Sequence, residues 1–211
     1  MVEPFAHASV MVRETIAALA PRSGCIYADA TAGGGGHSQA ILEASAPDGR
    51  VVAVDRDPSA VEETRRRLAG YGARAVVVHG DYGDLGSILR AQGTERVDGL
   101  VADLGVSSPQ LNVAERGFSF SHEGPLDMRM DTTRGETLAD LLARVDEREL
   151  ADIIFQYGEE RRSRPIARSI IRARDEDDLA TTTDLRRAVL RGSGPRKKHG
   201  IDPATRSFQG L

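Results

Sequence analysis

Short runs of β-branched and other apolar residues alternate with helical patterns through the first half of the 211-residue chain. The apolar runs cover residues 24–29, 50–55, 75–79 and 97–103. Helical spacing of apolar residues predicts helices at residues 9–19, 37–44, 58–68 and 85–91. Strands that are apolar on both faces and alternate with helices are typical of a parallel sheet covered on both sides. The first half is therefore predicted to fold as an α/β sheet.

The pattern changes after Asp103, where a loop rich in Gly, Ser and Pro is followed by amphipathic segments. Helices are predicted at residues 138–145, 147–157, 166–174 and 183–190. No strand pattern returns in this half, so a small all-helical domain is the simplest interpretation. We expect residues 1–109 to belong to the sheet domain, 110–200 to the helical domain and 201–211 to a segment returning towards the sheet domain.

Composition limits the class of protein further. No apolar run approaches the roughly 20 residues that a membrane-spanning helix needs, and the N-terminus lacks the features of a signal peptide. The single cysteine, Cys25, excludes a disulfide scaffold and a zinc site built from cysteines. The histidines have no metal-ligand spacing. These features predict a cytoplasmic protein that binds neither a membrane nor a metal.

Basic residues gather in one part of the chain. The whole chain has 28 basic and 32 acidic residues, but residues 159–206 contain 13 basic and 8 acidic ones. A locally positive surface can bind a polyanion even when the whole protein is acidic. Candidate contacts with such a polyanion are Arg161, Arg162, Arg164, Arg168, Arg172, Arg174 and the loop 196–198. A solvated, arginine-rich helix surface is the alternative.

A glycine-rich turn at residues 33–36 follows the first predicted strand, and Asp55 ends the second. Glycines let a main chain approach a ligand closely, and the next helix offers free amide donors. A carboxylate about 20 residues further on is placed to bind ribose hydroxyls, so an adenosine cofactor is expected. Asp29, just before the turn, favours S-adenosylmethionine over a dinucleotide because it would repel a pyrophosphate.

Two more candidate residues follow the third and fourth predicted strands. Tyr82 and Asp103 lie where parallel strands end, and ligands of such sheets bind outside the carboxyl ends of the strands. Tyr82 is therefore expected beside an adenine ring, with capping of the core as the alternative.

Several segments in a fixed order resemble one family in particular. These segments are TAGGGGHS (31–38), DRDP (55–58), DLGVSSPQL (103–111), ERGFSF (115–120), GPLDMRMD (124–131), YGEER (157–161) and PATR (203–206). They resemble the RsmH (MraW) family of bacterial ribosomal RNA methyltransferases, and the likeness runs from His7 almost to the last residue. Pro165 interrupts a helix that is continuous in the family, and it is expected to restart the helix because proline suits a first turn.

The resemblance implies S-adenosylmethionine-dependent methylation of the N4 amine of a cytidine in 16S rRNA, near the decoding centre of the small ribosomal subunit, and no DNA partner. It implies a class I, Rossmann-like methyltransferase sheet with an inserted all-helical substrate domain. The family's cofactor contacts fall on Gly35, Gly36, His37, Asp55, Tyr82, Asp103 and Gln110.

Asp103 is the only catalytic candidate. The exocyclic amine of cytosine is a poor nucleophile, and an acceptor such as the Asp103 carboxylate would localise its lone pair and take up developing positive charge. A purely cofactor-binding carboxylate is the alternative. The target base must leave its stack to reach the pocket. Phe118 and Phe120 are candidate stacking surfaces, and packing between the domains is the alternative for them.

Members of the RsmH family continue well past residues 208–209, whereas this sequence stops at Leu211. The sheet is therefore expected to be incomplete, with residues 97–103 at an exposed edge that invites self-association. The sequence does not predict whether this chain is active by itself. The alternative function is a catalytically impaired RNA-binding or ribosome-assembly protein, and a nicotinamide oxidoreductase is a more distant one.

Overall fold

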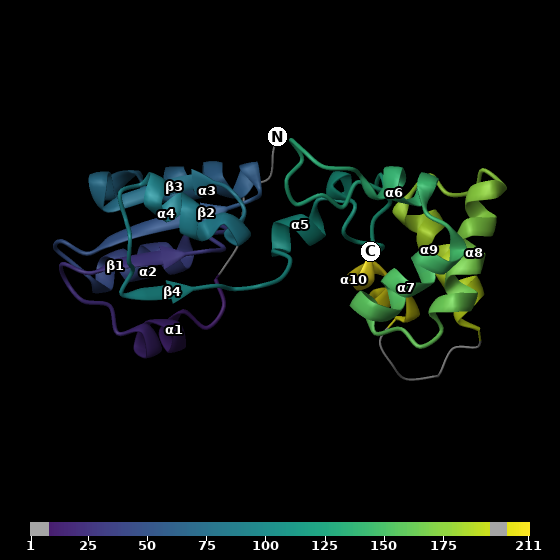
Figure 1. The fold of residues 1–211 in the computed structure, drawn as a ribbon, viewed down its shortest axis with the longest axis horizontal. Helices are drawn as coiled ribbons and strands as arrows, with labels where there is room; N and C mark the ends of the chain where they lie inside the picture. Colours follow the sequence, from purple (N-terminus) through teal and green to yellow (C-terminus); the bar gives the residue numbers. More distant parts are fainter. Residues whose placement is uncertain (1–8, 195–201) are drawn as a thin grey trace. The chain divides into compact units, whose positions relative to one another are not determined.

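The computed structural model describes residues 9–194 and 202–211, and two compact units make up this part of the chain (Figure 1). The first unit comprises the residues up to Pro109 together with Met130–Thr133. The second comprises Gln110–Arg129 and Arg134–Leu211. His7, His199 and the basic loop 196–198 lie outside the described residues. None of the described helices combines the length and the apolar character needed to cross a membrane.

The first unit is built on a parallel sheet. Its strands are β1 (Ile26–Asp29), β2 (Arg50–Asp55), β3 (Ala75–His79) and β4 (Gly99–Val101), in the order β3-β2-β1-β4. The valines of β2 are almost fully buried because helices cover both faces of this inner strand. All three strand pairings are parallel, which confirms the α/β sheet expected from the sequence.

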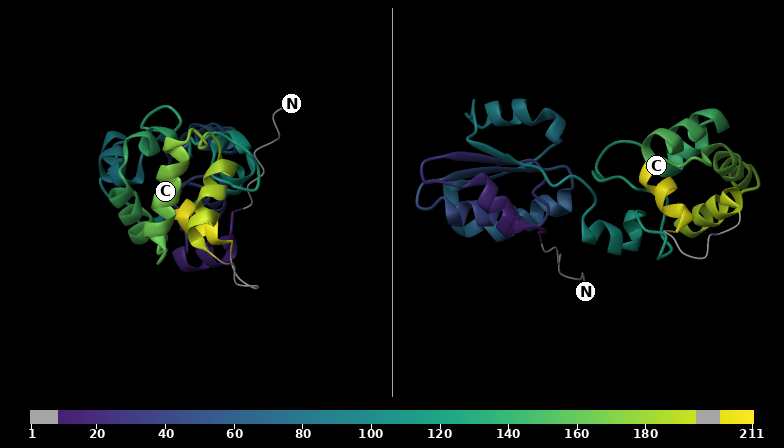
Figure 2. Two further views of the ribbon diagram at one scale, coloured as in Figure 1. Left: turned by 90° about the vertical axis from the view of Figure 1, so that its right-hand side faces the viewer. Right: turned by 90° about the horizontal axis from the view of Figure 1, so that it is seen from below.

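Four α-helices cover the sheet of the first unit. They are α1 (Val12–Leu19), α2 (Gly36–Ala44), α3 (Pro58–Leu68) and α4 (Leu85–Ala91), with short 3-10 helices η1 (Ala69–Arg74) and η2 (Tyr82–Asp84). Figure 2 shows α4 on one side of the sheet and the other three helices on the opposite side. The two buried clusters agree with this view, since Leu89 of α4 packs with one set of strand residues and Leu42 of α2 with the other.

Local signals explain several of these boundaries. Asp57 caps α3 by accepting a hydrogen bond from the Ser59 amide at 3.0 Å, and Pro58 occupies the first turn. The observed α3, α4, β2 and β3 begin and end at the residues expected from the sequence. The strand β4 is shorter than the predicted 97–103, because only residues 99–101 pair with β1.

The second unit is helical. It contains the 3-10 helix η3 (Ala114–Arg116), α6 (Leu138–Arg144), α7 (Glu147–Gly158), α8 (Ser163–Asp175), α9 (Thr182–Ser193) and α10 (Pro203–Gly210), while α5 (Ser108–Asn112) lies at the boundary of the units. Its core gathers fully buried side chains such as Leu150, Ile154, Ile170 and Leu185. Thr181 and Asp184 form a capping box at the start of α9. As expected, Pro165 lies in the first turn of α8.

The sequence analysis did not anticipate α5 or α10. The helix α10 packs on α7 and α9, and the ring of Phe208 enters the core of the helical unit. Gly158 at the end of α7 allows this packing, because a Cβ atom there would collide with the carbonyl oxygen of Arg206. That the 201–211 segment leads back towards the sheet remains a prediction.

Candidate functional site

The carboxyl ends of the strands carry the glycine turn of the first unit. Gly33 and Gly35 have φ values of 53° and 79°, in the left-handed region that favours glycine. The amide of Gly35 donates to the carbonyl of Ala32 at 2.7 Å, which closes the turn. The Thr64 hydroxyl of α3 donates to the carbonyl of Gly33 at 2.9 Å. The turn is therefore held in place by α3 as well as by its own hydrogen bonds.

Asp55 at the end of β2 joins this turn directly. Its Oδ2 atom accepts a hydrogen bond from the Gly33 amide at 2.7 Å, and its Oδ1 atom accepts one from the Asp57 amide at 2.9 Å. Burial raises the pKa of this carboxyl above its usual value, against the lowering effect of the two amides. A carboxylate offers about four acceptor positions, so two amides leave Asp55 capacity to accept hydrogen bonds from a ligand's hydroxyls.

Asp29 lies beneath the turn and has no exposed surface. Its Oδ2 atom accepts from the Ser38 hydroxyl at 2.7 Å, and its Oδ1 atom accepts from the Thr31 amide at 3.2 Å. Burial raises the pKa of the Asp29 carboxyl, and the hydrogen bond from Ser38 opposes that shift. Asp29 thus links the end of β1 to α2. Because its carboxyl group is buried, it would influence a ligand electrostatically and not by direct contact.

Asp103 follows β4, and its side chain is exposed. Its main-chain amide donates to Oγ1 of Thr31 at 2.7 Å. The structure therefore places the Asp103 main chain at the end of β1, beside the glycine turn. Sequence reasoning missed the anchoring roles of Thr31 and Thr64, although Thr31 lies within a segment that carried the family resemblance.

The remaining predicted cofactor residues differ in their surroundings. Tyr82, in η2, is 49% exposed, so its ring does not cap the core. His37 is buried, and its Nε2 atom lies 2.9 Å from the carbonyl oxygen of Val10. Any contact of His37 with a ligand is therefore expected through its main chain. Gln110 is buried and belongs to the second unit, unlike the other predicted cofactor residues.

The candidate arginines in α8 and just before it fall into two groups. Arg168 pairs with Glu147 at 3.1 Å, and Arg174 donates to the carbonyls of Leu142 and Val145 at 3.2 and 2.9 Å. Among the candidate arginines, the exposed ones without an ion pair to a described residue are Arg161, Arg162, Arg164 and Arg172. Arg174 therefore has a structural role, whereas the second group is available to a polyanion.

Arg164 of this second group lines a cleft of about 410 Å³. Its lining residues come from α7 and α8 and are Glu147, Arg148, Ala151, Asp152 and Arg164. The cleft therefore presents two guanidinium groups along with two carboxylates, and selective binding there would depend on geometry rather than on net charge.

The two candidate stacking residues pack within the helical unit. The ring of Phe120 meets that of Phe208 edge to face at a centroid distance of 5.0 Å, and the guanidinium of Arg186 lies 5.6 Å from the centre of the Phe120 ring. Phe118 is half-buried, with the Arg116 guanidinium 5.8 Å from its centroid. Phe120 is thus a core residue of this unit, and Phe118 is the better candidate for contact with a base.

Comparison with known proteins decides the family. The MraW methylase family matches residues 4–211, nearly the whole chain. The chain belongs to the MraW methylase family. This confirms the resemblance carried by the glycine turn, the strand-end carboxylates and the later motifs. Within the described part of this MraW family member, no group of three or more His, Cys, Asp or Glu side chains could hold a metal ion.

Relatives of this MraW family member are named as ribosomal RNA methyltransferases. The ribosomal RNA small subunit methyltransferase H of Sorangium cellulosum is 54% identical over 205 residues, which cover 97% of this chain and 64% of the relative. The protein of the same name from Citrifermentans bemidjiense is 47% identical, covering 100% of this chain and 68% of the relative. The chain thus spans about two thirds of the length of these relatives.

Solved structures match only part of the chain. The C-terminal domain of precorrin-6Y C5,15-methyltransferase from Rhodobacter capsulatus is 24% identical with a TM-score of 0.38, covering 50% of this chain and 56% of that one.

Proposed function

We propose that this chain carries out S-adenosylmethionine-dependent methylation of the N4 amine of a cytidine in 16S rRNA, near the decoding centre of the small ribosomal subunit. Membership of a methylase family, with relatives named for the ribosomal RNA of the small subunit, supports this proposal. The observation that carries it is the contact between Asp55 and the Gly33 amide, because it brings the carboxylate proposed to bind ribose and the glycine turn together.

S-adenosylmethionine is the methyl donor expected of a methylase family, and the residues of the first unit fit it. Asp55 would accept hydrogen bonds from the ribose hydroxyls, and the exposed ring of Tyr82 would flank the adenine. The main-chain amides of Gly35, Gly36 and His37 would hold the carboxylate of the amino-acid portion. When bound, the cofactor supplies an electrophilic methyl group on a sulfonium. Gln110 is the further contact that we propose from the helical unit.

Asp103 would orient the amine that is methylated. A carboxylate or main-chain carbonyl that accepts a hydrogen bond from the amine localises its lone pair and takes up positive charge as the bond forms. The anchoring of the Asp103 amide by Thr31 supports this role, because a positioned group contributes more than a mobile one. A cofactor-binding role for the same carboxylate is compatible with this assignment.

We propose that the helical unit holds the RNA backbone. The exposed arginines Arg161, Arg162, Arg164 and Arg172 have no ion pair among the described residues, so binding a phosphate there breaks no internal pair. Arg168 is already paired with Glu147 and contributes less. The target cytidine would leave its stack to be methylated.

Calorimetry with S-adenosylhomocysteine tests the cofactor site. The Asp55→Asn variant should bind at least tenfold more weakly, because a hydrogen bond to a charged group contributes about 1.5–3 kcal/mol. The control is Asp48→Asn, which removes one exposed carboxylate from the loop before β2. Unchanged affinity in Asp55→Asn would show that the site lies elsewhere.

Methyl incorporation separates an enzyme from a non-catalytic binder. Small ribosomal subunits from cells that lack the enzyme would be incubated with the purified chain and labelled cofactor. Label at one cytidine amine is expected. Binding to these subunits without incorporation would favour the alternative of a catalytically impaired RNA-binding or assembly protein.

A further inference from the structure

Met130–Thr133 is a short segment that belongs to the sheet unit by its contacts, although its neighbours in sequence on both sides belong to the helical unit. We call Met130–Thr133 the strap. It includes the end of the GPLDMRMD motif. This part of the motif belongs neither to the proposed cofactor contacts nor to the candidate RNA-binding residues.

Asp131 anchors the strap to the sheet. Its side chain is only 3% exposed, and its Oδ2 atom lies 3.3 Å from Nε2 of His79. Its Oδ1 atom accepts hydrogen bonds from the amide and the hydroxyl of Thr133, at 3.0 and 2.6 Å. Nε2 of His79 also lies 3.1 Å from the carbonyl oxygen of Arg56. Because both neighbours of this nitrogen are acceptors, it carries a proton and donates.

The anchor lies at the strand ends that form the candidate cofactor site. His79 is the last residue of β3, and in the sheet register it is the Cα partner of Asp55. The amide of Gly80 donates to the carbonyl of Asp55 at 2.9 Å, and Tyr82 follows two residues later. The strap is therefore fixed to the end of β3, where His79 pairs with the residue expected to bind ribose.

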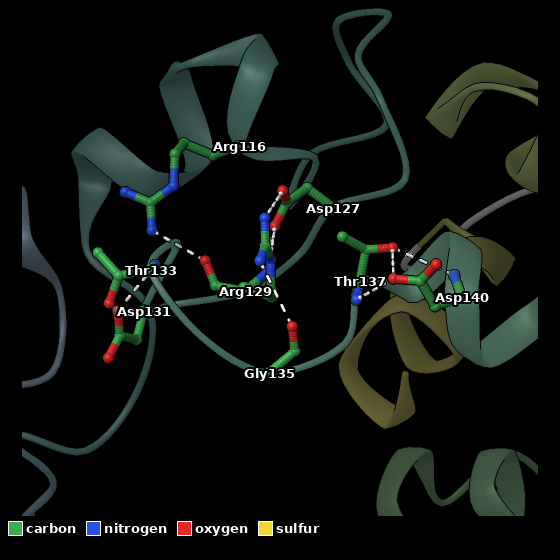
Figure 3. A network of polar contacts seen from close by, with 8 residues as sticks. All are labelled: Arg116, Asp127, Arg129, Asp131, Thr133, Gly135, Thr137 and Asp140. Atoms are coloured by element: carbon green, nitrogen blue, oxygen red, sulfur yellow. Dashed lines mark hydrogen bonds and ion pairs between the residues drawn. The ribbon is translucent and has the colours of Figure 1, made fainter.

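The chain before and after the strap is held by its own polar network (Figure 3). Arg129 donates to both carboxylate oxygens of Asp127, at 2.9 and 2.7 Å, and this pairing holds the pKa of Asp127 below its usual value. The guanidinium of Arg116 donates to the carbonyl of Arg129 at 3.0 Å. Thr137 and Asp140 form a capping box after the strap. Such a network restricts the main chain on both sides of the strap.

We propose that Asp131 is a positioning residue of the cofactor site, which acts by fixing the strap through His79 against the ends of β2 and β3. The strap then forms one wall of the site and keeps the end of β3 in register beside Asp55. This inference rests on the proposed cofactor site, and it gives that site a contribution from outside the strand ends.

Binding of S-adenosylhomocysteine to the full chain tests the proposal. Asp131→Ala and His79→Ala should each raise the dissociation constant about tenfold, the effect of losing one charged hydrogen bond. The two effects should be less than additive in the double variant, because both changes remove the contact between Asp131 and His79. His79→Gln, whose side-chain amide can still donate to Asp131, should restore most of the affinity. Thr132→Ala, at an exposed strap position, is the matched control.

Hydrogen exchange of the strap provides a readout that needs no cofactor. Amides of residues 130–133 should exchange faster in His79→Ala than in the unmodified chain, and His79→Gln should exchange like the unmodified chain. Failure of the unmodified chain to bind S-adenosylhomocysteine would overturn the proposed function, and the strap's role with it. Normal binding by the unmodified chain and by both alanine variants would overturn the role of Asp131 alone. Unchanged strap exchange in His79→Ala would show that His79 is not the anchor.

Discussion

The main-chain amide of Asp103 donates to the hydroxyl of Thr31 at 2.7 Å, joining the ends of β4 and β1 across 72 positions of sequence. The main chain of the proposed catalytic residue is thereby fixed to the residue that leads into the glycine turn. A change at Thr31 should therefore affect Asp103 without touching its carboxylate.

Thr31→Val removes the acceptor while keeping the shape of the side chain. One hydrogen bond contributes about 1 kcal/mol, and an exposed one less, so methyl transfer should slow by roughly threefold to fivefold. Steady-state methylation of small subunits would measure this. Thr31→Ser keeps the hydroxyl and should react at nearly the normal rate. A normal rate in Thr31→Val together with slowing in Thr31→Ser would mean that the methyl group of Thr31, rather than its hydroxyl, matters.

Asp29→Asn should change how stability depends on pH. Burial raises the pKa of Asp29 in the folded chain, so the folded state holds this proton more tightly than the unfolded state. The resulting contribution to stability is fully present below the ordinary pKa of aspartate, about 4, and is lost as pH rises through the folded value. Compared with Asp29→Asn, the unmodified chain should therefore gain stability as pH falls from neutral towards 4.

Urea unfolding at several pH values would measure this difference. Asp48→Asn, at an exposed position, corrects for the loss of one carboxylate. The expected sign would be contradicted if the unmodified chain became more stable relative to Asp29→Asn as pH rose above neutral.

Gly158→Ala should destabilise the helical unit. A Cβ atom at Gly158 would collide with the carbonyl oxygen of Arg206, so α10 would have to move away from α7. Overpacking of this kind costs about 1–3 kcal/mol, measurable as a lower urea midpoint. Gly70→Ala is the matched control, because a Cβ atom there meets nothing within 4 Å. Equal loss in both variants would point to glycine's main-chain freedom rather than to helix packing.

The β4 edge should promote self-association. β4 pairs only with β1 among the described strands, and Leu100 in the middle of β4 is 52% exposed. A lysine on an edge strand opposes pairing with another chain, so Leu100→Lys should shift the sedimentation profile towards monomer. Leu104→Lys changes an equally apolar residue that is 69% exposed but lies outside the strand. An equal shift in both variants would indicate general surface hydrophobicity rather than the edge.

Local sequence patterns predicted the regular parts of the fold well. The run of valines that forms β2 and the Asp57–Pro58 pair that starts α3 carry their signals within a few neighbouring residues. The turn and Asp55 could also be placed together, because parallel strands end at the same edge. The short helix α5, by contrast, is only five residues long and offered no periodicity to detect.

Such local patterns could not predict contacts between residues that are far apart in the sequence. Thr31 meets Asp103, Thr64 meets Gly33 and Asp131 meets His79 only because the fold brings separate segments together. Each of these side chains is an ordinary polar residue in its own neighbourhood. The sequence could therefore indicate which end of the sheet carries the site, but not the residues that hold the site in place.

Each buried cluster draws its members from one unit alone: Leu150 and Phe208 belong to one, and Ile41 and Val52 to others. Two separate interiors allow two separate melting events in a calorimetric scan. A nucleoside ligand bound at the strand ends would move the peak of the sheet unit by mass action, and it would move the other peak only as far as Gln110 contributes to binding. The shift of the second peak would then measure the contribution of the helical unit to the cofactor site.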